Sequence, residues 1–267
     1  MLSVGVREVQ AHLVTLTISM DAAQTIRQAV ARVAEIRVQA RSDPKLQVAL
    51  TGIKAFQAKR FAGTYADLLD SAEYGAAARF FLNDLYSDKD YSERDAQFSR
   101  IAGALQKFFP QQVVATAVFL AQLHVLTEEL DHQMAQAWLH ASADSTGDDV
   151  ARYIACWRFV GRSSDRTRQL EMVLSVGKDL DRLTRTTGLR LMLRMMRGPA
   201  HAAGLGSLQT FLEMGFDTFA GMSGRGSRAR EFLEFIRHRE GNWIELLSTG
   251  DIMRAGSDLT VCLARVD

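Results

Sequence analysis

Apolar residues recur at helical spacing along most of this chain. Residues at positions i, i+3, i+4 and i+7 share one face of an α-helix. In segment 202–220 this spacing aligns Leu205, Leu208, Leu212, Phe216 and Phe219. The same pattern predicts helices over 22–41, from Pro44 to Leu68, and over 73–86, 92–109, 110–142, 149–161, 164–185, 188–197 and 227–248. We therefore expect an all-α fold, a multi-helix bundle of about eight to ten helices.

Polar residues and proline mark the starts of several predicted helices. Asp21 is placed to cap the first helix, and Pro44 suits the first turn of the second. Ser92 is placed to cap the helix over 92–109, with Asp95 three residues later as a variant of the capping box.

The ends of the chain differ from the rest. Val, Thr and Leu alternate in part over Leu13–Met20 and Leu259–Val266, which is typical of a short strand or an irregular tail. The polar stretch ASADSTGDD at 141–149 is the clearest linker. We expect an N-terminal extension over 1–20, a helical bundle over 21–248 whose halves 21–142 and 149–248 are joined by a polar linker over 143–148, and a C-terminal tail over 249–267.

Composition supports a helical, globular protein. Only 3 of 267 residues are proline, well below the usual share of about 5%. The two cysteines, Cys156 and Cys262, have neither a pairing pattern nor metal-site spacing, which fits a reducing compartment. The N-terminus lacks an unbroken apolar stretch, and the apolar run Val113–Leu126 is too short to span a bilayer. We expect a cytoplasmic protein.

Residues 79–100, RFFLNDLYSDKDYSERDAQFSR, form the densest motif. The segment resembles the signature FFLxxLYxxxD(F/Y)xxRD of a family of uncharacterised bacterial all-helical proteins, a domain of unknown function. The resemblance extends through GPAHAAGLGSLQTFLEMGFDTF at 198–219 and so covers most of the chain. It implies a helical fold and no particular chemistry.

Charged residues within this motif lie on the inward side of two predicted helices. Arg94 and Asp95 fall within about 60° of Phe98 on the helical period. A charge that faces a core has to be paired, because an unpaired buried charge is very costly. We expect a structural clasp between two helices, in which Arg94 pairs with an acid of the preceding helix or turn. An exposed docking surface stays open as the alternative; the residues of the clasp or surface are Asp84, Tyr86, Asp88, Asp90, Tyr91, Arg94 and Asp95.

The long helix predicted over 110–142 carries a second cluster. His124, Glu128 and Asp131 fall within about 60° beside its apolar stripe, and His132 lies a little further round. Histidine and carboxylates are common metal ligands, so these four residues are a candidate site for a metal or haem. A polar flank on a half-buried helix has the same spacing.

A basic face follows in the second half of the chain. Arg190, Arg194 and Arg197 form a stripe, Arg182 and Arg185 precede it, and the other side of the helix is rich in Leu and Met. Such a face can bind an anionic membrane or phosphate, and it can equally be a solvated surface. With a net charge of +1, no overall field favours nucleic acid.

No catalytic set can be argued from residue spacing, which favours a protein that is not an enzyme. We expect a non-catalytic binding or interaction module whose partner is another protein or a second copy of the chain. Two alternatives remain: a metal- or haem-binding bundle at His124–His132, and an anionic membrane or phosphate contact at Arg182–Arg197. No cofactor is expected outside the first alternative.

Overall fold

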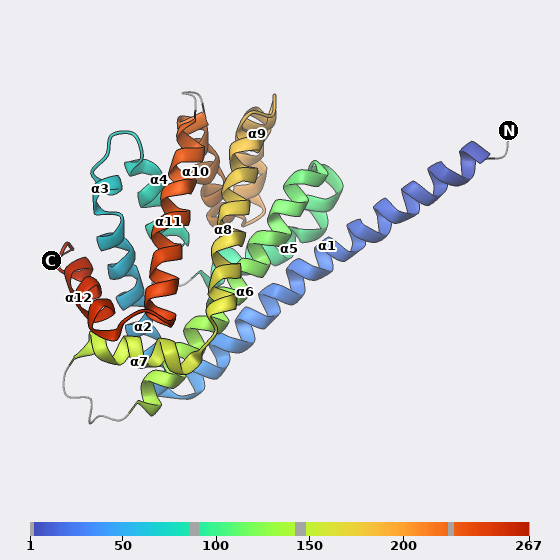
Figure 1. The fold of residues 1–267 in the computed structure, drawn as a ribbon. Coiled ribbons are helices and arrows are strands. Elements are labelled where there is room, and N and C mark those ends of the chain that lie inside the picture. Colours follow the sequence, from blue (N-terminus) through green and yellow to red (C-terminus); the bar gives the residue numbers. More distant parts are fainter. Residues whose placement is uncertain (1–2, 86–90, 142–147, 224–226, 267) are drawn as a thin grey trace.

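The chain is helical throughout the part that can be described. The computed structural model describes residues 3–85, 91–141, 148–223 and 227–266, apart from the side chains of 3–21, 84, 85, 108 and 223. Within these ranges it has twelve α-helices, one π-helical turn and no strand (Figure 1). They are α1 (Ser3–Ser42), α2 (Pro44–Thr64), α3 (Ala66–Leu69), α4 (Gly75–Phe80), the π-helical turn η1 (Phe81–Leu85), α5 (Ser92–Phe108), α6 (Gln111–His140), α7 (Asp149–Val160), α8 (Ser163–Thr184), α9 (Leu189–Ala202), α10 (Gly206–Ser223), α11 (Arg228–Ser248) and α12 (Ile252–Leu263).

The all-α prediction is confirmed, and the described residues form twelve α-helices, more than the predicted eight to ten, because one predicted helix is divided and the expected C-terminal tail contains α12. The second predicted helix ends at Thr64, and Ala66–Leu69 forms a separate turn. Ser71 then interrupts the helical path, since its hydroxyl accepts hydrogen bonds from the backbone N–H groups of Glu73 and Tyr74. Such side-chain bonds compete with helix continuation and favour turns.

Both chain ends are helical, which corrects the expectation of short strands or irregular tails. The backbone of α1 is helical from Ser3, so Asp21 lies within the helix and not at its N-terminus (Figure 1). At the other end, Asp251 caps α12 by accepting a hydrogen bond from the Arg254 N–H at 2.8 Å. Ala255, Leu259 and Cys262 are buried at helical spacing, and this spacing within α12 outweighed the partial alternation.

The two halves of the bundle share one hydrophobic core. Leu50 and Met134 from the first half pack in one cluster with Tyr153, Ile154 and Leu247 from the second. α6 lies at the centre and contacts α1, α2, α5, α7 and α8. Residues 142–147, which hold most of the predicted linker, lie outside the described part of the chain.

α6 is longer than the apolar run that predicts it. It spans Gln111–His140 and has the length and apolar composition to cross a membrane. The same helix buries Glu128, Asp131 and His132 among its neighbours in the bundle. A central core helix meets the same criterion of length and composition.

α12 approaches α2 closely at a glycine. A Cβ atom on Gly63 would overlap the carbonyl oxygen of Cys262, whose side chain donates to the Arg60 carbonyl at 3.3 Å. The absence of a side chain at Gly63 therefore sets the distance between these two helices.

Gly63→Ala is expected to lower the free energy of unfolding by about 1–3 kcal/mol, because the added methyl group overpacks a backbone contact. Gly52→Ala is the matched control on the same helix, since its Cβ would meet no described atom within 4 Å. That change is expected to be neutral or to stabilise by up to about 1 kcal/mol, since Ala favours helix over Gly. Urea unfolding followed by circular dichroism measures both. Equal effects at the two positions would contradict the close approach.

Candidate functional site

Charged side chains from four helices meet beside α6. Arg37 of α1 donates to the Asp95 carboxylate of α5 at 2.8 Å, and His124 of α6 contacts the same carboxylate oxygen at 3.0 Å. Glu128 of α6 accepts from Lys54 of α2 through both carboxylate oxygens at 2.8 Å. Arg37 also reaches Glu128 at 3.4 Å. We call these five residues the charge cluster; it ties α1, α2, α5 and α6 together.

The acids of the charge cluster are held in their ionised form. Burial opposes ionisation of Asp95, but the hydrogen bond and charge of His124 and the charge of Arg37 outweigh it, so the pKa of Asp95 is lowered. Burial likewise opposes ionisation of Glu128, and Lys54, His124 and Arg37 lower its pKa overall. Because these carboxylates already bind cationic side chains, the cluster resembles a structural network more than an open ligand site.

The predicted metal ligands are divided by these contacts. His124 faces Asp95 and Glu128 faces Lys54, whereas Asp131 and His132 are buried elsewhere on α6. Burial raises the pKa of Asp131, and burial lowers that of His132. Among the residues described, no group of three or more His, Cys, Asp or Glu side chains could hold a metal ion. The metal or haem site stays a prediction that this geometry does not favour.

The predicted clasp is described only in part. The Arg94 guanidinium lies over the rings of Tyr91 at 3.9 Å and Phe211 at 4.4 Å, so this side chain connects α5 with α10. Tyr91 donates to the Asn83 carbonyl at 3.0 Å. The acids expected to pair with Arg94 are Asp84, Asp88 and Asp90. The side chain of Asp84 and all of Asp88 and Asp90 lie outside the described residues, as does Tyr86.

Capping by Ser92 is a wrong prediction. α5 begins at Ser92 itself, and Tyr91 occupies the N-cap position without a side-chain cap. The Ser92 hydroxyl instead accepts from Arg37 at 3.3 Å. Asp95, expected to complete the cap, is instead part of the charge cluster, where it binds Arg37 and His124.

The basic stripe on α9 meets acids from its neighbour α10. Arg190, Arg194 and Arg197 are exposed. Arg190 pairs with Asp217 at 2.8 Å, and Arg197 contacts Glu213 at 3.1 Å. These ion pairs reduce the positive charge available to an external anion. Contact with a membrane or phosphate at this stripe therefore stays a prediction that the ion pairs do not favour.

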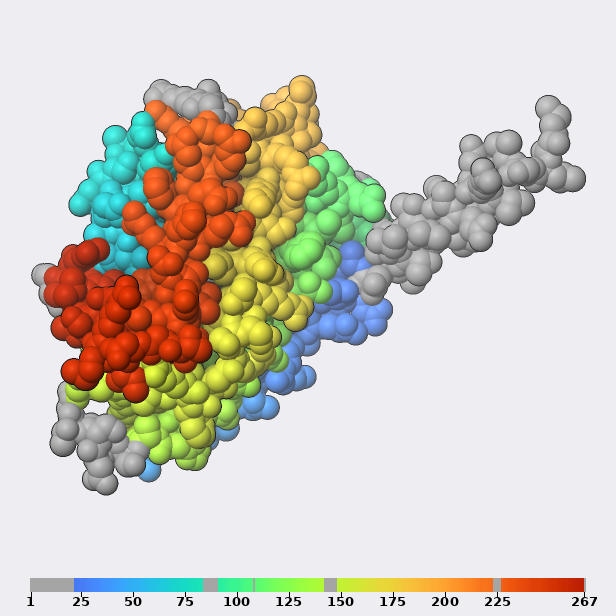
Figure 2. Space-filling view, in the orientation of Figure 1, coloured from blue at the N-terminus to red at the C-terminus, as the bar shows by residue number. Residues whose placement is uncertain are grey.

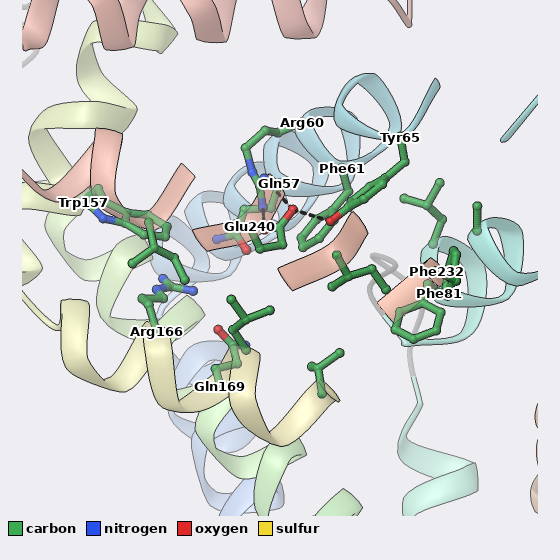
Figure 3. Close-up of a pocket in the computed structure, with 16 residues that line it drawn as sticks. Gln57, Arg60, Phe61, Tyr65, Phe81, Trp157, Arg166, Gln169, Phe232 and Glu240 are labelled. Carbon is green, nitrogen blue, oxygen red and sulfur yellow. Dashed lines mark hydrogen bonds and ion pairs between the residues drawn. The ribbon is translucent and has the colours of Figure 1, made fainter. Parts of the chain in front are cut away.

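A polar pocket lies between α2, α4, η1, α7, α8 and α11. Its volume is about 60 Å³, and its walls combine aromatic side chains with Arg60, Arg166, Gln57, Gln169 and Glu240. Figure 3 shows Arg166 and Gln169 on α8 near the Arg60–Glu240 pair, with Phe81 and Phe232 at the far end. In the space-filling view α8 and α11 lie against each other on the face shown (Figure 2). A Cβ on Gly177 would crowd the end of the Leu233 side chain at this contact.

One wall of the pocket is a buried ion pair. Arg60 donates to both oxygens of Glu240, at 3.2 and 2.9 Å, and the Tyr65 hydroxyl donates to the same carboxylate at 3.0 Å. Burial raises the pKa of Tyr65 well above its ordinary value, so Tyr65 stays a hydrogen-bond donor. The negative charge of Glu240 is thus matched within the wall itself.

Arg166, on another wall of the pocket, differs from Arg60 because no described acid forms an ion pair with it. Only 6% of this residue is exposed. Its guanidinium lies over the Trp157 ring at 4.4 Å, and within the described ranges the side chain forms no ion pair and its Nη2 atom has no hydrogen-bond partner. Buried guanidinium groups are ordinarily paired, because an isolated buried charge is costly. The charge of Arg166 acts favourably on the buried Asp131 carboxylate, but no described acid forms a direct ion pair with it, so Arg166 marks a site beside the pocket at which an anion would be stabilised.

Spacing alone could have indicated these pocket residues, although sequence reasoning missed them. Arg166 lies four and seven positions before Leu170 and Val173 on the inward stripe of α8. On α2, Gln57 and Arg60 lie four and seven positions after the buried Ile53. A polar residue that occupies an apolar stripe is informative, because such positions are ordinarily filled by hydrophobic side chains.

Comparison with known proteins adds a family and no chemistry. No curated protein and no solved structure matches this chain. A family model described as a domain of unknown function (DUF8198) matches residues 36–253. The matched region contains the charge cluster and all residues of the polar pocket. Since the model covers more than half of the chain, the protein belongs to the DUF8198 family, a domain of unknown function.

Proposed function

We propose that this domain is a non-catalytic binding protein that holds a small organic anion in the polar pocket. The observation that carries the proposal is Arg166, a buried guanidinium with no ion-pair partner among the described residues. Guanidinium presents N–H donors in a planar fork that matches carboxylate and phosphate oxygens. An anion at Arg166 would supply the missing acceptor.

The rest of the pocket favours an organic ligand over a bare inorganic ion. Phe61, Phe81, Trp157 and Phe232 line it together with aliphatic side chains. A ligand pocket of this kind gains affinity from apolar walls and orientation from a few polar groups. Glu240 does not repel an anion strongly, because Arg60 and Tyr65 neutralise and bind its carboxylate. We infer a carboxylate with an apolar body.

Hexanoate is a suitable probe, and 1-hexanol is its uncharged counterpart. Arg166→Gln is expected to weaken hexanoate binding by about tenfold to a hundredfold, as expected for a lost hydrogen bond to a charged group. Binding of 1-hexanol should be weak and unaffected by the substitution. Isothermal titration calorimetry measures both ligands against both proteins.

The matched control is Arg168→Gln, which removes an exposed arginine from the same helix and should leave hexanoate binding unchanged. Unfolding of the ligand-free proteins separates binding from structure. Arg166→Gln also removes the contact with the Trp157 ring and the favourable charge beside buried Asp131, so a modest fall in the free energy of unfolding is expected while the protein stays folded. Equal hexanoate affinity in wild type and Arg166→Gln would overturn the proposal, as would no binding to wild type.

A further inference from the structure

A second cavity lies beside the polar pocket and is mostly apolar. Its volume is about 180 Å³, and it is bounded by α1, α4, η1, α5, α6, α8, α9 and α10. Apolar cavities of roughly 150 Å³ in other proteins bind small hydrophobic molecules. The cavity is thus large enough for part of an apolar ligand.

The two cavities share part of their walls. Phe81 and Val173 line both of them. Phe81 opens the π-helical turn η1, and its ring meets Phe80 edge-on at 6.3 Å and Phe232 at 5.4 Å. π-helical turns often occur at functional sites. Phe81, which lines both the polar pocket and the apolar cavity, therefore lies at an irregular point of the fold.

Polar groups at the apolar cavity are already engaged. Asp95 and His124 line it, but they bind each other and Arg37. Arg94 stacks on Tyr91 and Phe211. A charged ligand group would compete with these contacts here, whereas Arg166 in the neighbouring pocket forms no ion pair with any described acid.

We infer that the ligand is a long-chain carboxylate whose anionic head binds Arg166 and whose hydrocarbon tail passes Phe81 into the apolar cavity. This inference rests on the proposed function and adds the ligand class. The polar pocket alone holds a head group with a short apolar body, and the adjoining cavity accommodates a longer chain.

Chain length is the direct test. Butanoate, hexanoate, octanoate, decanoate and dodecanoate are titrated below their micelle concentrations into wild-type protein. Affinity should increase by about fourfold for each methylene that enters the cavity. The gain should stop when the cavity is full.

The second test fills the apolar cavity with a larger side chain. Ala117 of α6 lines the apolar cavity, so Ala117→Phe should weaken dodecanoate binding at least tenfold and leave hexanoate binding unchanged. Ala115→Phe places the same side chain at an exposed position of the same helix and should change neither. Ala117→Leu, a smaller filler, replaces Ala117→Phe if circular dichroism shows that the larger variant does not fold.

The outcomes separate the two proposals. If hexanoate binds through Arg166 but longer chains gain nothing, the tail inference is wrong and the proposed function stands. If Ala117→Phe leaves dodecanoate affinity unchanged, the tail lies elsewhere and the inference is again wrong. If dodecanol binds as tightly as dodecanoate and Arg166→Gln has no effect on either, the anion site itself is wrong.

Discussion

Arg60→Met is expected to lower the free energy of unfolding by about 3–5 kcal/mol, since it leaves a buried carboxylate without its cation. Arg60 is 5% exposed and Glu240 is 8% exposed, so water replaces little of the lost interaction. Tyr65 keeps its hydrogen bond to Glu240 but carries no charge. Urea unfolding at neutral pH measures the change.

A second substitution separates the lost pair from lost packing. Arg60→Met combined with Glu240→Leu removes both charges, so most of the stability should return. In this double variant the Tyr65 hydroxyl has lost its acceptor, which should still lower the free energy of unfolding by about 1–3 kcal/mol. Adding Tyr65→Phe should remove this remaining loss.

Arg254→Met is the surface control for this prediction. Its pair with Asp258 spans 3.5 Å on an exposed helix face. It should change the free energy of unfolding by less than about 1 kcal/mol. If Arg60→Met has no larger effect than this control, the pair is not the buried element described above.

Much of the architecture follows from local sequence patterns. The stripe Leu208, Leu212, Phe216 and Phe219 predicts α10, because apolar spacing at the helical period is a strong and local signal. Local patterns failed where contacts with distant segments determine whether a stretch is helical or where a helix ends. The predicted helix from Pro44 to Leu68 is divided at Tyr65, whose hydroxyl binds Glu240 of α11, and α12 is held by contacts with α2 and α7.

The candidate site could be predicted less well, because its residues come from distant segments. The inward position of Asp95 followed from its spacing to Phe98, but its partner Arg37 lies on α1 and no spacing rule connects the two. Arg166 shares a helix face with Leu170, so its burial was predictable. The lack of an ion-pair partner within the described ranges was not, because it depends on all helices around it.

Arg37→Met is expected to lower the free energy of unfolding at neutral pH by about 2–3 kcal/mol, less than Arg60→Met because Arg37 is partly exposed. Arg37 contacts both Asp95 and Glu128, so its loss weakens two ionised carboxylates at once. Arg32→Met is the matched control on α1: its pairs with Glu35 and Glu129 lie near the surface, so this change should lower the free energy of unfolding much less than Arg37→Met.

The effect of Arg37→Met should depend on pH in a defined direction. The charge cluster lowers the pKa values of Asp95 and Glu128 below their ordinary values of 3.8 and 4.5. Such carboxylates stabilise the fold above those values, and this stability is lost as pH falls and they become protonated. In Arg37→Met the pKa values of Asp95 and Glu128 rise toward the ordinary ones. Protonation of these two carboxylates therefore lowers the free energy of unfolding less in the variant than in the wild type. The difference between wild type and variant should therefore be largest near neutral pH and shrink toward about pH 3. A difference that stays constant across that range in urea unfolding would show that Arg37 contributes through packing and not through its charge.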